Sequence, residues 1–198
     1  MANSRDITAR KTAETRIRRL NRVYAVLSGI NVQIVRARDR NELFREACEV
    51  AVEVGGFRMV WIGIVDRVAM RIVPIAFAGA EHDFLTITEN RFSLLDSAEA
   101  AATSSVRSVR QKQPIVLNEI REDSNIFFAK KRLAKGIHLM AFLPLIVAEE
   151  AVGMRTLHAD EINYFDAEAM KLFTQLSGDI SFAIDHINTQ ERLDYLGA

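Results

Sequence analysis

The chain has 198 residues, 49% of them apolar and 26% charged, and its formal net charge is zero. This length allows one substantial core or two small ones, and the balanced charge provides no bulk attraction to nucleic acid or anionic membrane. The longest apolar runs, such as 139–148, are much shorter than the roughly 20 residues of a membrane-spanning helix, and no signal-peptide core follows the N-terminus. A single cysteine excludes an internal disulfide and fits a reducing compartment. We therefore expect a cytoplasmic protein without nucleic-acid partners or membrane insertion.

Residues 5–37 contain no proline and one glycine, which predicts a single long helix. Apolar positions in this segment alternate in steps of three and four, as in a coiled coil. This pattern predicts a dimer seam in which a polar asparagine sets the register: Ile17, Leu20, Tyr24, Leu27, Asn31 and Ile34. The alternative is an amphipathic helix that lies on its own domain.

A second helix is predicted from Asp39, which with Glu42 forms a capping-box pattern, to about Val54. Two β-rich segments follow, 59–65 and 70–78, joined by a turn at 66–67, and Pro74 in the second indicates a bulge or an edge strand. Beyond them we expect a short helix at 83–87, an extended piece near Phe92, and a helix over 97–112 capped by Ser97.

The remaining elements include a strand at 114–118 and a short helix at 127–135 that ends at Gly136. Segments 138–147 and 151–159 form a hairpin about Glu149 and Glu150. A last helix begins at Asp166 and extends to about residue 195, with heptad-spaced apolar residues that predict a second part of the seam: Phe173, Leu176, Ile180 and Ile187. The sum predicts an α+β fold with an antiparallel sheet of five to six strands and long terminal helices packed on one face.

The order and spacing of several short stretches resemble the GAF family over roughly residues 40–190. The matching stretches are Gly56-Phe57, 61–66 (WIGIVD), 113–116 (QPIV), Gly136, 143–145 (LPL), Val152-Gly153 and 164–168 (YFDAE). The resemblance implies a sensory domain at 39–190. Departures from the pattern include the absence of glycine over 97–105, Arg155 where leucine is usual, and His158 where tyrosine is common. The signature of cyclic-nucleotide-binding members is also absent.

The two ends of the chain resemble other signalling modules. Residues 6–11 (DITARK) are similar to the closing motif of a PAS domain, and 191–196 (ERLDYL) are similar to the lead-in to a GGDEF domain, which makes cyclic di-GMP. These resemblances imply a linker helix at 1–38 after a PAS domain and, at 191–198, the start of a linker to an output domain. Histidine kinases use similar linkers.

No catalytic constellation is found by its spacing: no phosphate-binding loop, nucleophile elbow or zinc-protease motif is present. Methionine-sulfoxide reductases with a GAF fold rely on several cysteines, whereas Cys48 stands alone on the apolar side of a predicted helix. We therefore expect a non-catalytic domain, and the sequence identifies no cofactor and no metal site.

A hairpin centred on Glu149 and Glu150 would place His138 and His158 on opposite faces of the sheet, and Arg155 on the same face as Met140 and Phe142. A buried guanidinium needs an anionic or hydrogen-bonding partner. The partner is either a ligand carboxylate or phosphate, or an internal acid such as Asp66, Glu119 or Asp123.

The expected function is a regulatory module that binds a small ligand, relays a signal through dimeric helices, or does both. The candidate ligand-binding residues are Trp61, Phe84, Phe92, His138, Met140, Phe142 and Arg155. The alternatives are an unliganded dimerisation spacer, in which the pocket is closed by these side chains, and the input domain of a histidine kinase.

Overall fold

A computed structural model describes residues 2–79, 92–95, 103–122 and 129–197. Five strands form one antiparallel sheet in the order β2-β1-β5-β4-β3. Their bounds are β1 Met59–Asp66, β2 Arg71–Gly79, β3 Ile115–Leu117, β4 Leu139–Val147 and β5 Glu150–Ala159. The predicted α+β class and strand number are confirmed.

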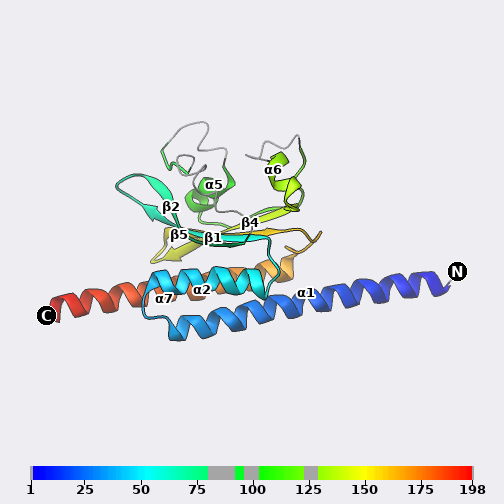
Figure 1. The fold of residues 1–198 in the computed structure, drawn as a ribbon, viewed down its shortest axis with the longest axis horizontal. Helices are drawn as coiled ribbons and strands as arrows, with labels where there is room; N and C mark the ends of the chain where they lie inside the picture. Colours follow the sequence, from blue (N-terminus) through cyan, green and yellow to red (C-terminus); the bar gives the residue numbers. More distant parts are fainter. Residues whose placement is uncertain (1, 80–91, 96–102, 123–128, 198) are drawn as a thin grey trace.

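Helices cover both faces of the sheet (Figure 1). On one side, α2 (Arg40–Glu53) and α7 (Ala167–Gly197) contact the strands, and α1 (Ala2–Arg36) packs on these two helices. On the other side lie α5 (Ser104–Gln111) and α6 (Ala129–Ala134). We call the first side of the sheet the α7 face and the second the α5 face. The long terminal helices therefore lie together on one side, as predicted.

Side chains cap the starts of α2, α5 and α7. Asp39 accepts hydrogen bonds from the amides of Asn41 and Glu42 at the start of α2, at 2.8 and 2.9 Å. Asp166 accepts from the amide of Ala169 at 2.8 Å at the start of α7. Helix α5 differs from the prediction: Thr103, in an extended conformation, caps it, so the helix does not continue from position 97. Ser97 and the predicted helix at 83–87 lie outside the described residues.

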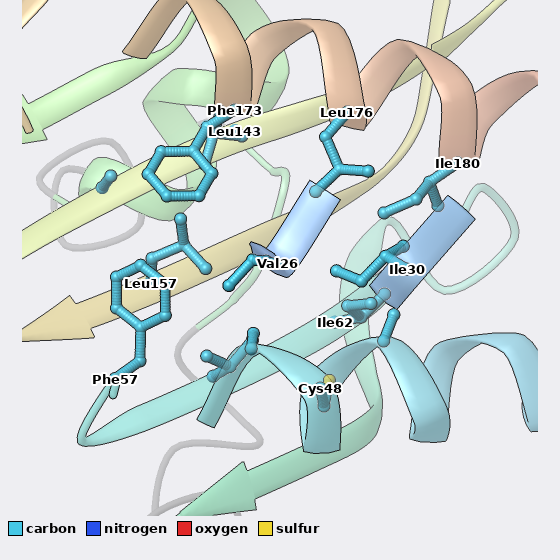
Figure 2. Close-up of a cluster of buried hydrophobic side chains, with 14 of the residues drawn as sticks. Val26, Ile30, Cys48, Phe57, Ile62, Leu143, Leu157, Phe173, Leu176 and Ile180 are labelled. Atoms are coloured by element: carbon cyan, nitrogen blue, oxygen red, sulfur yellow. The ribbon is translucent and has the colours of Figure 1, made fainter. Parts of the chain in front are cut away.

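The larger core lies on the α7 face. Figure 2 shows Val26 and Ile30 of α1 directed at Leu176 and Ile180 of α7, while Phe173 meets Leu143 and Leu157 of the sheet. All seven of these side chains are fully buried, so α1 shares one continuous core with the sheet and α7. Burial of an aliphatic side chain contributes about 1.5–3 kcal/mol to the stability of the fold. Removing α1 would expose several such side chains to water and lose these contributions together.

The register of the central hairpin differs from the predicted one. The turn is formed by Ala148 and Glu149, both with positive φ (48° and 65°). A bulge between Leu145 and Ile146 then shifts the pairing by one residue, so that Leu143 lies opposite Arg155. Because side chains alternate along a strand, the one-residue shift exchanges the two faces for everything beyond the bulge. The shifted pairing skips Val152, and Pro144 and Gly153 lie beside it, but neither residue type fixes the position at which the register changes.

Helices α1 and α7 run parallel to each other. Arg19 of α1 pairs with Asp166 at the start of α7, and farther along Ile30 of α1 lies beside Ile180 of α7, so the residue numbers rise in the same direction along both helices. The first half of α1 projects from one end of the domain and the last turns of α7 project from the other (Figure 1). Among the described helices, none combines the length and the apolar character needed to cross a bilayer.

Candidate functional site

The α5 face carries a second, separate cluster of buried side chains. Four predicted ligand-binding residues belong to it: Trp61, Phe92, Met140 and Phe142, each at most 6% exposed. The rings of Trp61 and Phe92 lie 4.9 Å apart at a tilt of 39°. Helices α5 and α6 cover this cluster with apolar side chains, Val106 among them. The structure therefore brings these four residues together in one buried cluster.

Arg155 does not belong to this group. The bulge in the hairpin places its side chain on the α7 face, where it is fully buried. It donates hydrogen bonds to the carbonyl oxygen of Phe173 at 3.1 Å and to the hydroxyl of Ser177 at 3.2 Å, both on α7. The predicted placement of Arg155 on the same face as Met140 and Phe142 is therefore wrong, and its partners are neutral groups of α7 rather than Asp66 or Glu119. Asp123 lies outside the described residues.

The guanidinium of Arg155 is electrostatically unfavourable where it lies. Its Nε and Nη1 atoms have no hydrogen-bond partner among the described residues. Burial lowers the pKa of Arg155 to about 10. A buried charge whose only acceptors are neutral lowers the free energy of unfolding. A contribution to stability therefore does not explain why an arginine occupies this position.

Two basic groups that the sequence did not indicate as a pair lie on the α5 face. Nη1 of Arg132, on α6, is 3.1 Å from Nδ1 of His158, on β5. An arginine only donates, so Nδ1 accepts and the proton of the neutral imidazole is on Nε2. Burial, together with the adjacent Arg132 charge, lowers the pKa of His158 well below its ordinary value. Burial also lowers the pKa of Arg132 to about 10. This end of the face therefore combines a guanidinium with a neutral imidazole.

The sequence indicated one member of this pair, His158, as a strand residue, but it did not indicate Arg132. His158 follows the alternation of β5, but its face depended on the bulge, and nothing in the short segment around Arg132 marks that arginine as buried. His138 precedes β4 and is exposed, so the argument that placed the two histidines on opposite faces no longer applies. Phe84 lies outside the described residues. Among the residues that the structure describes, no group of three potential metal ligands gathers.

The sequence pattern of the GAF domain family matches residues 37–185, three quarters of the chain. The chain belongs to the GAF domain family. Comparison with curated protein sequences finds no match.

Solved structures with the same fold include proteins of different kinds. Free methionine-R-sulfoxide reductase from Neisseria meningitidis, solved with its substrate, is 12% identical with a TM-score of 0.69, over 85% of this chain and 91% of that one. The GAF domain of a phosphoenolpyruvate-protein phosphotransferase from Coxiella burnetii is 16% identical with a TM-score of 0.68, over 86% and 96%. Residues 122–287 of a methyl-accepting chemotaxis protein are 16% identical with a TM-score of 0.61, over 81% and 98%. At these identities the likeness concerns the fold.

In this GAF domain the only cysteine of the sequence is part of the core. Cys48, on α2, is fully buried on the α7 face (Figure 2). Burial raises the pKa of its thiol to about 12, although the charge of Arg155 acts in the opposite direction. A thiol in this setting is protonated and packed, and it is not a nucleophile.

The predicted seam divides between core and surface. On α1, Ile17 and Tyr24 are 57% and 55% exposed and Asn31 is also exposed. Leu20 and Ile34 are partly buried, and Leu27 is buried in the domain core. On α7 the expectation differs from the structure, because Phe173, Leu176 and Ile180 are fully buried in the core of the single chain and Ile187 packs against it. These four apolar residues hold α7 on its own domain. The exposed aromatic residue of this part of α7 is Phe182, at 75%.

Proposed function

We propose that this chain is the regulatory input module of a bacterial cytoplasmic signalling protein, in which α1 receives a signal and α7 passes it on. The observation that carries the proposal is the arrangement of these helices. They pack in parallel on one core, and they leave the domain at opposite ends. A displacement of α1 therefore acts on the same side chains that hold α7, such as Leu176 and Ile180.

The surface of α1 supports a dimer as the working form. Residues 5–18 are exposed along their whole length. A helical segment of this length that projects alone into water is only marginally stable. Ile17 and Tyr24 lie seven residues apart on this surface, in line with Asn31, which is the spacing of a coiled-coil seam. A second copy of the chain, packed along this line, would cover both apolar side chains and support the projecting helix.

The α5 face is the proposed site of a small ligand. Arg132 and His158 place a guanidinium and an imidazole N–H beside Met140, which favours a ligand with an acceptor or an acidic group at that end. Apolar and aromatic side chains such as Trp61 and Phe142 line the rest of the face. Small-molecule sites in proteins commonly combine an apolar lining with a few polar groups.

A specific observation favours the second candidate, an unliganded spacer. Trp61, Phe92, Met140 and Phe142 are each at most 6% exposed, and the first two are in ring contact, so they fill part of the face themselves. In this version the α5 face is ordinary core, and the signal comes only through α1. Neither proposed function includes catalysis by a thiol. Cys48 is the only cysteine, and its burial and raised pKa oppose thiol chemistry.

The relay is tested by fusing the chain to an output domain. The resemblance of 191–196 to a GGDEF lead-in makes a diguanylate cyclase domain the appropriate reporter, and a PAS domain the expected upstream partner. One to seven residues are inserted into the helix after Glu191, and cyclic di-GMP synthesis is measured. We expect activity to vary with the phase of the insertion, because each added residue rotates the helix by about 100°. Equal activity in all seven fusions would contradict a helical relay.

The ligand is tested by native mass spectrometry after incubation of the chain with a bacterial small-molecule extract. We expect a bound species that disappears in Arg132→Gln and is retained in Arg155→Met, the matched change on the opposite face. Absence of any adduct with the wild-type chain would favour the unliganded spacer.

A further inference from the structure

Three arginines on one side of α1 face three acids around the start of α7. Arg16, Arg19 and Arg22 are spaced by three residues, and they pair with Glu168, Asp166 and Glu161, in that order. The distances are 2.6 Å for the first pair and 2.5 Å for the second. Exposed ion pairs contribute little, so the burial of each pair decides its importance.

The middle pair is the buried one. The side chain of Arg19 is 9% exposed and that of Asp166 is 30% exposed, whereas Arg16 and Glu168 are 61% and 44% exposed. Breaking a desolvated pair leaves a charge without its counterion, which costs more than losing a pair in water. Arg19–Asp166 is therefore the contact of the three that responds most strongly to a movement of α1.

Asp166 has a second function in the same structure. Its Oδ2 accepts from Arg19, while its Oδ1 accepts from the amide of Ala169 and caps α7. Its backbone oxygen also accepts the first helical hydrogen bond, from Met170 at 2.9 Å. One residue thus joins the middle of α1 to the first turn of α7.

The connection that precedes α7 is held by α1 as well. Arg22 pairs with Glu161, and its guanidinium lies 5.2 Å from the centre of the Tyr164 ring. The hydroxyl of Tyr164 donates to the backbone oxygen of Gly55, at the end of α2. The segment between β5 and α7 is consequently fixed from two sides, and its freedom depends on where α1 lies.

We propose that Arg19 and Asp166 form a switch contact that couples the position of α1 to the capping of α7, so that a signal on α1 reaches α7 without passing through the sheet. With the contact made, Asp166 is oriented toward both Arg19 and Ala169. With the contact broken, the carboxylate is free to rotate, and the first turn of α7 loosens. The inference rests on the proposed function in taking α1 as input and α7 as output, but the contact lies within one chain and does not require a dimer.

The test is hydrogen exchange of the full chain, followed at the amides of Ala169 and Met170 and normalised to amides of β5. In Arg19→Gln we expect exchange at these two amides to rise about tenfold, the scale of one charged hydrogen bond, with no change in β5. Asp166→Asn keeps a capping side chain and removes the charge, and it should give a similar rise. The double variant should add nothing to either single change, and Arg19→Lys should restore part of the protection.

Arg16→Gln is the matched control, because its pair lies on the same helices but is exposed. It should leave exchange at both amides unchanged. Unchanged exchange in Arg19→Gln, or additive effects in the double variant, would overturn the switch. A rise that is equal in β5 would show only global destabilisation and would also overturn it. Sedimentation of the same variants separates this result from the dimer, since a monomer with coupled α1 and α7 would contradict the proposed dimer and leave the switch intact.

Discussion

Arg155 offers a prediction in which the usual expectation for a buried residue is reversed. Its guanidinium is fully buried on the α7 face, and its hydrogen-bond acceptors, the oxygen of Phe173 and the hydroxyl of Ser177, are neutral. Because the pKa of Arg155 is lower in the folded chain, to about 10, than in the unfolded one, the charge opposes folding at every pH below that value. Replacing it with an apolar side chain of similar length should therefore not be harmful.

The expected change in the free energy of unfolding follows from two opposing contributions. The lowering of the pKa of Arg155 corresponds to about 3 kcal/mol that opposes folding. Arg155→Met removes this opposition and loses two hydrogen bonds from a charged donor, each of about 1.5 kcal/mol. Both acceptors keep a partner, because the Ser177 hydroxyl itself donates to the oxygen of Phe173 at 3.0 Å. We expect Arg155→Met to leave the free energy of unfolding unchanged within about 1 kcal/mol, and Arg155→Ala to lower it by about 2 kcal/mol through the cavity it leaves.

The assay is urea unfolding followed by circular dichroism near pH 7, with the midpoint and slope fitted for each variant. Arg19→Met is the contrasting control, because the nearly buried guanidinium of Arg19 pairs with the carboxylate of Asp166, and it should destabilise the chain. A loss of more than about 2 kcal/mol in Arg155→Met would refute the reasoning. That result would mean that an anion compensates the charge of Arg155, which the neutral contacts to α7 do not provide.

Three further predictions concern single positions. Cys48, buried and with a pKa of about 12, should react with a thiol reagent at least about a hundredfold more slowly in the native chain than in urea. Lys112 ends α5 with a φ of 54°, so Lys112→Gly should raise the free energy of unfolding by about 0.5–1 kcal/mol in thermal unfolding. Gly153→Ala should lower it by about 3 kcal/mol, because a Cβ there would lie 2.5 Å from the oxygen of Gly63, and Gly178→Ala, where nothing lies within 4 Å, is its control.

Much of the fold could be predicted because its signals are local. Asp39 and Asp166 mark helix starts by a chemistry that needs only the next three residues. Pro74 indicates an edge or a bulge, and the structure shows both, since β2 is an edge strand and its pairing shifts beside Pro74. The sheet, its number of strands and the side taken by the long helices follow from such signals together.

The site was less predictable because it depends on one residue of register. The bulge at Leu145 and Ile146 exchanges the faces of β5, so that Arg155 lies on the α7 face while His158 pairs with Arg132 on the α5 face. Pro144 and Gly153 lie beside the shift and are compatible with a bulge, but neither sets its position. The seam of α7 was misplaced for a related reason: heptad spacing looks the same whether Phe173 and Leu176 meet a second chain or their own sheet.

The central claim is that two chains pair along the exposed line of α1, and native mass spectrometry of the purified chain tests it most directly. The account predicts a species of twice the chain mass of 22.3 kDa, which becomes a single chain in Ile17→Asp with Tyr24→Asp. Both side chains are more than half exposed in the protomer, so the fold should survive, and Ile162→Asp, at a position 75% exposed elsewhere, should remain a dimer. A wild-type chain that appears only at 22.3 kDa at micromolar concentration would contradict the account.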